Sequence, residues 1–489
     1  MIKADCRWSR AAPLYRWRFS FGVRSAIGSI AIALLWQLHI WASDDDRGWE
    51  FRPYQIKAVV ALDVPGGLAE KLAMELPRHL RERVDAAIGP LWSFEAQLAK
   101  GVLRQSVLSN LRTGGSTSPG DFSSNGDKLL LLALESKADG FQLTAREFDH
   151  YIQRWGPPIR RESRQCEMLA EQMFALARQA VAPLANLEVD PNDPKKIVLH
   201  ARGGGLFSAG SGEPWARPGD VFLPVLRRTS RGGELAENGI QVVPWTYVEA
   251  ASIEGSKGVG LIHSGSRRPF GTRRGGRVEQ IAVALCADPG ETRLYLHSRT
   301  NPDKPLTGYE LYVQKPGEEA TARIGTSDSN GRITVRAGAH PVQTLFVKHG
   351  GQLLAKLPVV PGAESEIKVP LPDDDMRLEA EARLAAMREE LVDVVARRNI
   401  LMARARQKIE EKNFEAAQEL MRSVDQLPGR SQFNLTLTTA SRLLRSDDPQ
   451  IQRRIDQLFQ ATQMVLTQYL DARPISELHE ELRAAQRKQ

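Results

Sequence analysis

Cysteine is scarce in this sequence, since its 489 residues include only Cys6, Cys166 and Cys286. No two of them have the short spacing of a metal-binding pair, so no zinc site is expected. Cys6 precedes the apolar N-terminal run, which excludes it as the modified cysteine of a lipoprotein. Cys166 and Cys286 either form one disulfide in an oxidising compartment or remain two buried thiols.

Signatures of catalysis are also missing. The sequence has no G-x-S-x-G, no H-E-x-x-H and no G-x-x-x-x-G-K. His263 and Ser264 are adjacent, but neighbouring side chains of a strand point to opposite faces. Asp328-Ser-Asn-Gly331 begins like a calcium loop, yet the twelfth position, which needs a bidentate Glu, is Ala339. A hairpin turn accounts for this motif, with calcium binding as the alternative. We therefore expect no catalytic residue, no metal ion and no cofactor.

A large excess of one charge is absent once the N-terminus is set aside. The formal net charge is +7, and residues 1–43 supply +5 of it, because they contain six Lys or Arg and one Asp. The remaining +2 does not indicate a nucleic-acid partner. One local exception consists of five arginines within eleven residues, Arg267, Arg268, Arg273, Arg274 and Arg277. Guanidinium groups suit phosphate, sulfate or carboxylate, so this loop either binds an acidic glycan or another polyanion, or is a solvated basic hairpin.

The N-terminus looks like an export signal. A basic flank that includes Arg7 and Arg24 precedes the 17-residue apolar run Ser25–Trp41, and Asp44 follows soon after. This order is typical of a signal peptide over residues 1–43, while an uncleaved single-pass anchor or a buried helix are the alternatives. We expect a periplasmic, cell-envelope or secreted protein, and nothing after the run is apolar enough to cross a membrane.

The rest of the chain predicts a multidomain α+β protein of four parts. Residues 44–185 read as an α/β unit, with a strand over 54–62, a helix over 68–84 that Pro77 could kink, a second strand over 91–98, a hairpin around Asp139-Gly140 and a closing helix that includes Cys166. Residues 186–289 predict a small antiparallel barrel, with strands such as 220–227, 240–247 and 258–263. The segment Arg217–Leu226 resembles the opening of SH3-like barrels.

Residues 290–372 alternate strands with turns, and the candidate strands cover 294–297, 308–314, 322–326, 332–336, 344–348 and 366–370. The strand Gly308–Val313, the turn Asp328–Gly331 and the strand Ile333–Val335 resemble the carboxypeptidase-regulatory-like (transthyretin-like) β-sandwich family. The resemblance implies a seven-stranded sandwich that serves as a structural or adhesive module.

Residues 373–489 predict helices. One long helix covers 375–411, and a later helix begins with Asp448 and Pro449 and continues to about residue 473. The segment from Phe414 to Leu420 resembles one tetratricopeptide-type hairpin over 400–428, which implies a single helical hairpin.

The order of the parts, together with the segments Val394–Ala403 and Phe414–Ala417, resembles exported multidomain proteins of planctomycete-type bacteria. That resemblance implies an architecture and no activity. Our leading hypothesis is a non-enzymatic envelope protein that binds an envelope protein or an acidic glycan and self-associates through its C-terminal helices. A hydrolase with an unrecognised site at the junction of the α/β unit and the barrel is the alternative.

Overall fold

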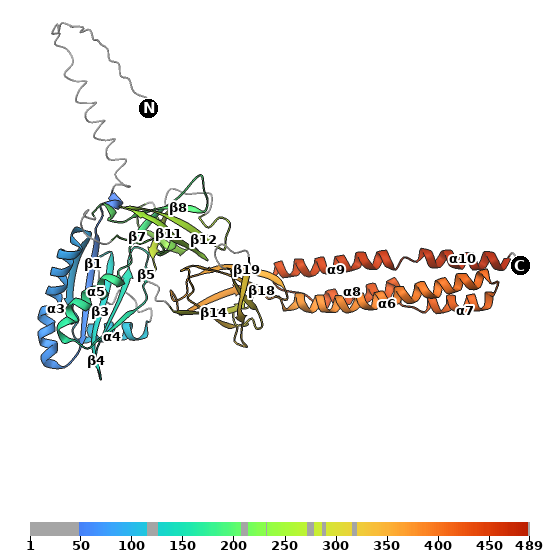
Figure 1. Cartoon of the computed structure of the whole chain (residues 1–489), viewed down its shortest axis with the longest axis horizontal. Helices are drawn as coiled ribbons and strands as arrows, with labels where there is room; N and C mark the ends of the chain where they lie inside the picture. The colour runs from blue at the N-terminus through green and yellow to red at the C-terminus, as the bar shows by residue number, and fades with distance from the viewer. Residues whose placement is uncertain are drawn as a thin grey trace, which may run out of the picture.

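The computed structural model describes residues 48–114, 126–206, 214–230, 232–270, 278–285, 290–314 and 320–487. It consists of a head, built from an α/β unit, a barrel and a sandwich, and a helical stalk that extends from the sandwich (Figure 1). The predicted export signal, Cys6, Cys286 and three arginines of the basic loop, Arg273, Arg274 and Arg277, lie outside the described residues. No helix in the described ranges combines the length and apolar character that a membrane span requires.

The α/β unit is a mixed sheet with helices on both faces. Its strand order is β2-β1-β3-β4-β5, with β6 also paired to β4, and β1 is parallel to both β2 and β3. The elements are β1 (Tyr54–Asp63), α3 (Gly66–Ala87), η1 (Gly89–Leu91), β2 (Trp92–Leu98), α4 (Gly101–Thr113), β3 (Lys128–Lys137), β4 (Gly140–Asp149), β5 (Arg154–Trp155), β6 (Ile159–Ser163), η3 (Cys166–Met168) and α5 (Leu169–Ala180).

This topology confirms the predicted β-α-β unit and the hairpin at Asp139-Gly140. α3 and α5 cover one face of the sheet, where Leu76 and Met173 are buried, and α4 covers the other through Val107 and Leu111. Leu72, Leu76, Leu80 and Val84 recur every four residues, which places them on one side of α3. α3 is assigned as one uninterrupted helix through Pro77.

Six antiparallel strands form a closed barrel in the circular order β9-β11-β12-β8-β7-β13, and β10 extends the sheet beside β9. The strands are β7 (Leu184–Val189), β8 (Lys196–Ala201), β9 (Val221–Thr229), β10 (Leu235–Val242), β11 (Thr246–Glu254), β12 (Lys257–Ser264) and β13 (Val278–Ala284), with the short η4 (Gly204–Leu206) after β8. Gly260 faces the interior, because a Cβ there would lie 2.4 Å from Cγ1 of Val248.

The barrel and the α/β unit share one core. Phe222 of β9 points into the barrel, whereas Leu223 and Val225 point outward into the core formed by α3 and α5. The single strand predicted over 240–247 was wrong. Pro244 and Trp245, which has φ of 50°, separate β10 from β11, and sequence alternation alone did not show this break.

The sandwich has seven strands in two sheets, ordered β17-β14-β20 and β16-β15-β18-β19. They are β14 (Glu291–Ser298), β15 (Glu310–Gln314), β16 (Thr321–Thr326), β17 (Arg332–Arg336), β18 (Gln343–His349), β19 (Gln352–Val359) and β20 (Glu366–Leu371). Only β19 was not predicted from the sequence. At the predicted turn, Asp328 Oδ1 accepts hydrogen bonds from the backbone N–H groups of Asn330 (2.9 Å) and Arg332 (2.7 Å). The segment is a tight turn, but the predicted hairpin was wrong, because β16 and β17 on either side of it belong to different sheets.

The stalk is a helical bundle of α6 (Asp375–Glu410), α7 (Phe414–Asp425), α8 (Arg430–Leu443), α9 (Pro449–Tyr469) and α10 (Arg473–Arg487). α6 runs away from the head, α7 and α8 return beside it, and α9 and α10 run outward again (Figure 1). With 36 residues, α6 is ~54 Å long at ~1.5 Å per residue. The long helix and the hairpin after it confirm the prediction. The helix that begins at Pro449 ends at Tyr469, before the predicted stop, and α8 and α10 were not predicted.

Candidate functional site

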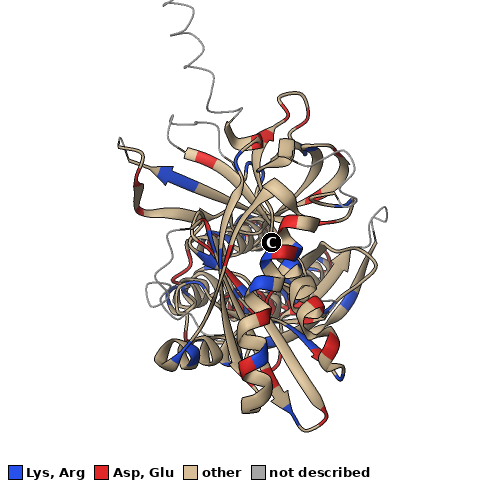
Figure 2. Cartoon of the chain, turned by 90° about the vertical axis from the view of Figure 1, so that its left-hand side faces the viewer, with Lys and Arg blue, Asp and Glu red and all other residues tan. Residues whose placement is uncertain are grey.

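A large open cleft lies where the three parts of the head meet. Its volume is ≈ 1750 Å³, and its walls come from the α/β unit, the barrel and the segments of the sandwich near Gly290 and Glu364. Arginines are its most frequent charged residues, and they are Arg112, Arg146, Arg154, Arg160, Arg161, Arg178, Arg202 and Arg217. Six carboxylates also line it, those of Glu147, Asp149, Asp220, Glu291, Glu364 and Glu366. The charged residues of the cleft are thus of both signs, and Figure 2 shows Lys or Arg and Asp or Glu interspersed along the ribbon of the head.

An ion pair joins the walls of this cleft. Arg154 of β5 donates from Nη2 to Oε1 of Glu364 at 2.7 Å, and both side chains are partly exposed. Arg146 of β4 is held more deeply, since it donates to the carbonyl of Gly156 (2.9 Å) and to Oδ1 of Asn110 (3.0 Å). Its guanidinium lies 4.7 Å from the ring centroid of Trp155. Burial lowers the pKa of Arg146 from its ordinary value.

The floor of the cleft contains a buried ion cluster at the junction of the α/β unit and the barrel. Lys128, at the start of β3, has a fully buried side chain. Its Nζ donates to Oε1 of Glu147 (3.0 Å), to Oδ2 of Asp149 (2.8 Å) and to the carbonyl of Ala182 (2.7 Å). The second oxygen of Glu147 accepts from Ala182 N at 3.0 Å. Lys128 and Glu147 of the sheet therefore bind both backbone polar groups of Ala182, in the linker that leads into the barrel.

Burial sets the protonation behaviour of this cluster. It raises the pKa of Glu147 from 4.5 to about 7, against the opposing effect of Lys128, and the nearby Asp149 adds to the rise. For Lys128, burial lowers the pKa, but the Asp149 and Glu147 carboxylates outweigh it and the pKa ends above its ordinary value. Tyr54, whose hydroxyl accepts from Leu184 N at 2.9 Å, has its pKa raised by burial to about 12.

Arg202 completes the junction from the barrel side. It is fully buried, donates to Oδ2 of Asp127 (2.5 Å) and to the carbonyl of Pro53 (3.0 Å), and lies over the ring of Tyr54 at 4.8 Å. The rings of Trp49 and Tyr151 approach its guanidinium at 5.7 and 5.9 Å. Arginine is suited to such a position because its flat cation stacks on aromatic faces.

The ion cluster is arranged as a structural link between the α/β unit and the barrel. Each oxygen of Glu147 has a donor, and so has each oxygen of Asp149, since its Oδ1 accepts from Tyr151 N at 2.8 Å and its Oδ2 from Lys128. The two side chains are almost completely buried. Acid–base catalysts also use carboxylates with a raised pKa in a cleft, so Glu147 is the residue that would serve the hydrolase alternative.

The predicted anion-binding loop begins at the end of β12. Arg267 and Arg268 are exposed, and Phe270 is partly buried against the core of the barrel. Whether the loop binds an anion stays a prediction.

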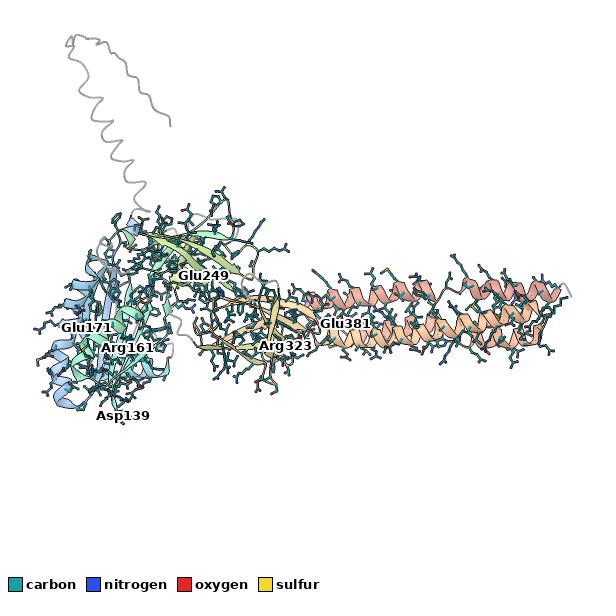
Figure 3. The ribbon with its side chains drawn as sticks, viewed as in Figure 1. Asp139, Arg161, Glu171, Glu249, Arg323 and Glu381 are labelled. Atoms are coloured by element: carbon teal, nitrogen blue, oxygen red, sulfur yellow. The ribbon has the colours of Figure 1, made fainter. Side chains whose placement is uncertain are left out.

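Trp215 and Trp245 pack in different cores, and the adjacent His263 and Ser264 have separate partners. Trp215 is buried in the barrel and donates to the carbonyl of Gly255, whereas Trp245 packs against the core of the sandwich. His263 contacts Oε2 of Glu249 at 2.8 Å and Ser264 contacts Thr246, so the two neighbours do not pair with each other. In Figure 3, Glu249 lies on the barrel, while Arg161 lies on the α/β unit. The expectation of a buried thiol was wrong for Cys166, because it lies in the short turn before α5, where its side chain is exposed and free.

Sequence reasoning missed Lys128, Glu147, Asp149 and Arg202. Lys128 is the first residue of the otherwise apolar start of β3, and Glu147 and Asp149 flank Phe148 at the end of β4. Charged residues at the ends of two apolar strands were therefore the available signal. Their partner Ala182 is 33 residues beyond Asp149, and nothing local indicates that contact.

Comparison with known proteins assigns no family. No family model and no curated protein matches this chain. Among solved structures, TolB from Acinetobacter baumannii aligns with a TM-score of 0.17 and 10% identity over 66% of this chain and 96% of TolB. The Bacillus anthracis TIE protein (0.14, 7% identity, 44% of this chain and 46% of that one) and the major pilin subunit BcpA of Bacillus cereus (0.13, 10%, 57% and 73%) are less similar. Scores this low carry no argument about fold or function.

Proposed function

We propose that this chain is an exported envelope protein that acts as a non-enzymatic scaffold, in which the head binds a partner and the stalk holds the head at a fixed distance from a second attachment point. The observation that supports this proposal best is the joint between the sandwich and the stalk. A spacer transmits position only if its base is rigid, and the base of this stalk is built from buried ionic and hydrogen-bonded contacts.

Asp374 and Arg377 form the centre of that joint, and both are buried. Arg377 donates from Nε and Nη2 to the two oxygens of Asp374 at 2.8 and 2.5 Å, and from Nη2 to the carbonyl of His349 at 3.1 Å. Asp374 N donates to the hydroxyl of Tyr309 at 2.8 Å, and the rings of Tyr309 and His349 stack with centroids 4.1 Å apart. The first turn of α6 is thereby connected to the four-stranded sheet of the sandwich, at His349 of β18 and at Tyr309 just before β15.

Further ion pairs surround this centre. Lys304 binds Asp373 and also Asp375, the latter at 3.0 Å. Arg299 binds Oδ2 of Asp448, the buried residue that caps α9, at 2.7 Å. Both outgoing helices, α6 and α9, are therefore attached to the sandwich. Glu381, which pairs with Arg377, marks the base of the stalk in Figure 3.

Two measurements test the proposal. Fractionation of cells that express the full chain should recover it from the envelope or the medium. The purified protein should show no turnover of generic ester, peptide, phosphate or glycoside substrates. A cytosolic location, or robust turnover by the wild type, would contradict the scaffold function.

A hydrolase is the second candidate, because Glu147 combines a raised pKa with a position on the wall of the cleft. In that case Glu147→Gln would abolish turnover while the tryptophan emission of the folded head stayed unchanged. Anion binding by the basic loop is a separate candidate, since Arg267 and Arg268 are exposed. It predicts that Arg273→Ala with Arg274→Ala weakens binding to anionic vesicles at low salt.

A further inference from the structure

Two adjoining helical segments of the stalk contain no charged residues of their own, although Arg388 and Arg398 of α6 donate to Thr462 and to the carbonyl of Tyr469 at their edge. Residues Ser431–Ser441 of α8 and Gln457–Tyr469 of α9 contain no Asp, Glu, Lys or Arg. The two segments belong to helices that pack on one another, and Arg430 at the start of α8 donates to Oγ1 of Thr467 at 2.9 Å. By contrast, fifteen of the 36 residues of α6 are charged. We refer to the uncharged segments of α8 and α9 together as the neutral face.

The neutral face exposes apolar side chains. Leu435 of α8 and Met464 of α9 are 70% and 62% exposed, and neither belongs to a core cluster. Because they project from helices whose opposite sides are buried, they do not stabilise the bundle itself. Depletion of charge, with apolar side chains among neutral polar ones, distinguishes the centre of a protein interface from ordinary surface.

The polar groups of this face fall into two sets. On α8, the hydroxyls of Thr436, Thr438 and Thr439 donate to carbonyls one turn earlier, at 3.1, 2.7 and 2.9 Å. Their oxygens therefore remain as acceptors. On α9, Gln460, Gln463 and Gln468 carry amide groups that can donate, and they line a shallow depression with Met464.

We infer that the neutral face is the contact surface between two copies of this chain, related by a two-fold axis. Such an axis places α8 of each copy against α9 of the other. The threonine acceptors of α8 then meet the glutamine donors of α9 in two equivalent contacts. A two-fold interface requires a patch that complements itself, and a face with both donors and acceptors meets this condition. A charged partner fits less well, because most of its charges would be desolvated against two segments that contain no charged side chains of their own.

The size of the face sets the expected strength. Thirteen residues of helix span ~20 Å, and two helices of ~10 Å diameter give a footprint of ~400 Å² on each copy. Stable complexes bury ~800 Å² per partner, so we expect a weak dimer with a Kd of about 10–1000 µM. This inference goes beyond the scaffold proposal and does not depend on what the head binds.

Sedimentation equilibrium of the full chain over about 5–500 µM tests the inference. The wild type should show a monomer–dimer equilibrium, and Leu435→Glu combined with Met464→Glu should raise the Kd at least about tenfold, because it places like charges face to face. Val392→Glu is the matched control. Val392 is 66% exposed on α6, outside the neutral face, and its substitution should leave the Kd within about twofold.

Unchanged helicity at 222 nm would show that both variants keep their fold. A spin label on Met464→Cys, in a background in which Cys6, Cys166 and Cys286 are all replaced by Ser, adds a second readout. Under a two-fold axis through the face, it should give one short intermolecular distance that disappears with Leu435→Glu. A wild type that stays monomeric throughout, or a dimer that the double variant leaves intact, would overturn the inference.

Discussion

The buried cation of the head junction gives the most quantitative prediction. Lys128→Met keeps most of the side-chain volume but removes the donor that serves Glu147, Asp149 and the carbonyl of Ala182. Breaking a buried ion pair by removing one partner costs ~3–5 kcal/mol, because the remaining charge is left uncompensated. At pH 8, above the pKa of about 7 that Glu147 has in the folded head, two buried carboxylates lose their cation, so the loss of unfolding free energy should lie at the upper end of that range.

The distribution of tryptophan permits a selective assay. Of the nine tryptophans, four lie in the predicted export signal (Trp8, Trp17, Trp36 and Trp41), four lie before or within the α/β unit and the barrel (Trp49, Trp92, Trp155 and Trp215), and Trp245 packs against the core of the sandwich. No tryptophan belongs to the sequence of the stalk. Urea unfolding followed by tryptophan emission therefore reports on the head, while ellipticity at 222 nm is dominated by the stalk. Lys128→Met should shift the first transition and leave the stalk transition in place.

Lys137→Met is the matched control, since Lys137 is an exposed residue at the other end of the same strand. It should change the free energy of unfolding by no more than about 0.5 kcal/mol. Adding Glu147→Gln and Asp149→Asn to Lys128→Met should recover much of the loss, because no buried charge then remains. If Lys128→Met costs under about 1 kcal/mol, or no more than Lys137→Met, the description of this cluster as a structural joint is wrong.

Three further predictions concern pH, the stalk base and the barrel. The pKa of Glu147 is raised from 4.5 to about 7, so between these pH values the folded head retains a proton that the unfolded chain has lost. The free energy of unfolding of the head should therefore fall by up to ~3 kcal/mol as pH rises from 4.5 to 7. Urea titrations at several pH values should show that Glu147→Gln removes this dependence. Arg377→Met should lower the free energy of opening the stalk base by ~3–5 kcal/mol, because it leaves the buried Asp374 without its ion pair. Hydrogen exchange should become faster in the first turns of α6 and stay the same in α7. Unchanged exchange in α6 would contradict this prediction. Gly260→Ala should destabilise the barrel by ~1–3 kcal/mol, because the new Cβ would clash with Val248. Gly66→Ala, whose Cβ would meet no atom within 4 Å, should not destabilise the protein. Equal urea midpoints of unfolding for the two variants would contradict the packing described.

The sequence predicted those parts of the fold that local patterns encode. The i+4 leucines of α3, the alternation in β1 and the cap at Asp448 each specify an element within one window of the chain. The two errors in the prediction of strands, the missing β19 and the undivided strand over 240–247, also have local causes. β19 follows a tight Gly350-Gly351 turn and contains Pro358, and the break between β10 and β11 depends on the unusual φ of Trp245.

The candidate site was less accessible to prediction, because its contacts are non-local. Arg154 and Glu364 are 210 residues apart, and Arg299 and Asp448 are 149 apart. The neutral face likewise requires knowing that α8 and α9 pack together. Motif searching could identify the arginine loop, but it could not show that Phe270 belongs to the barrel core.

Crosslinking in intact cells tests the central claim most directly. A photoreactive residue would replace Arg161, an exposed residue of β6 on the wall of the cleft, and the control would replace Met74, an exposed residue of α3 outside it. The account predicts one dominant adduct with an envelope component from position 161 and none from position 74. Recovery of the intact chain from the cytosol without such an adduct would contradict it.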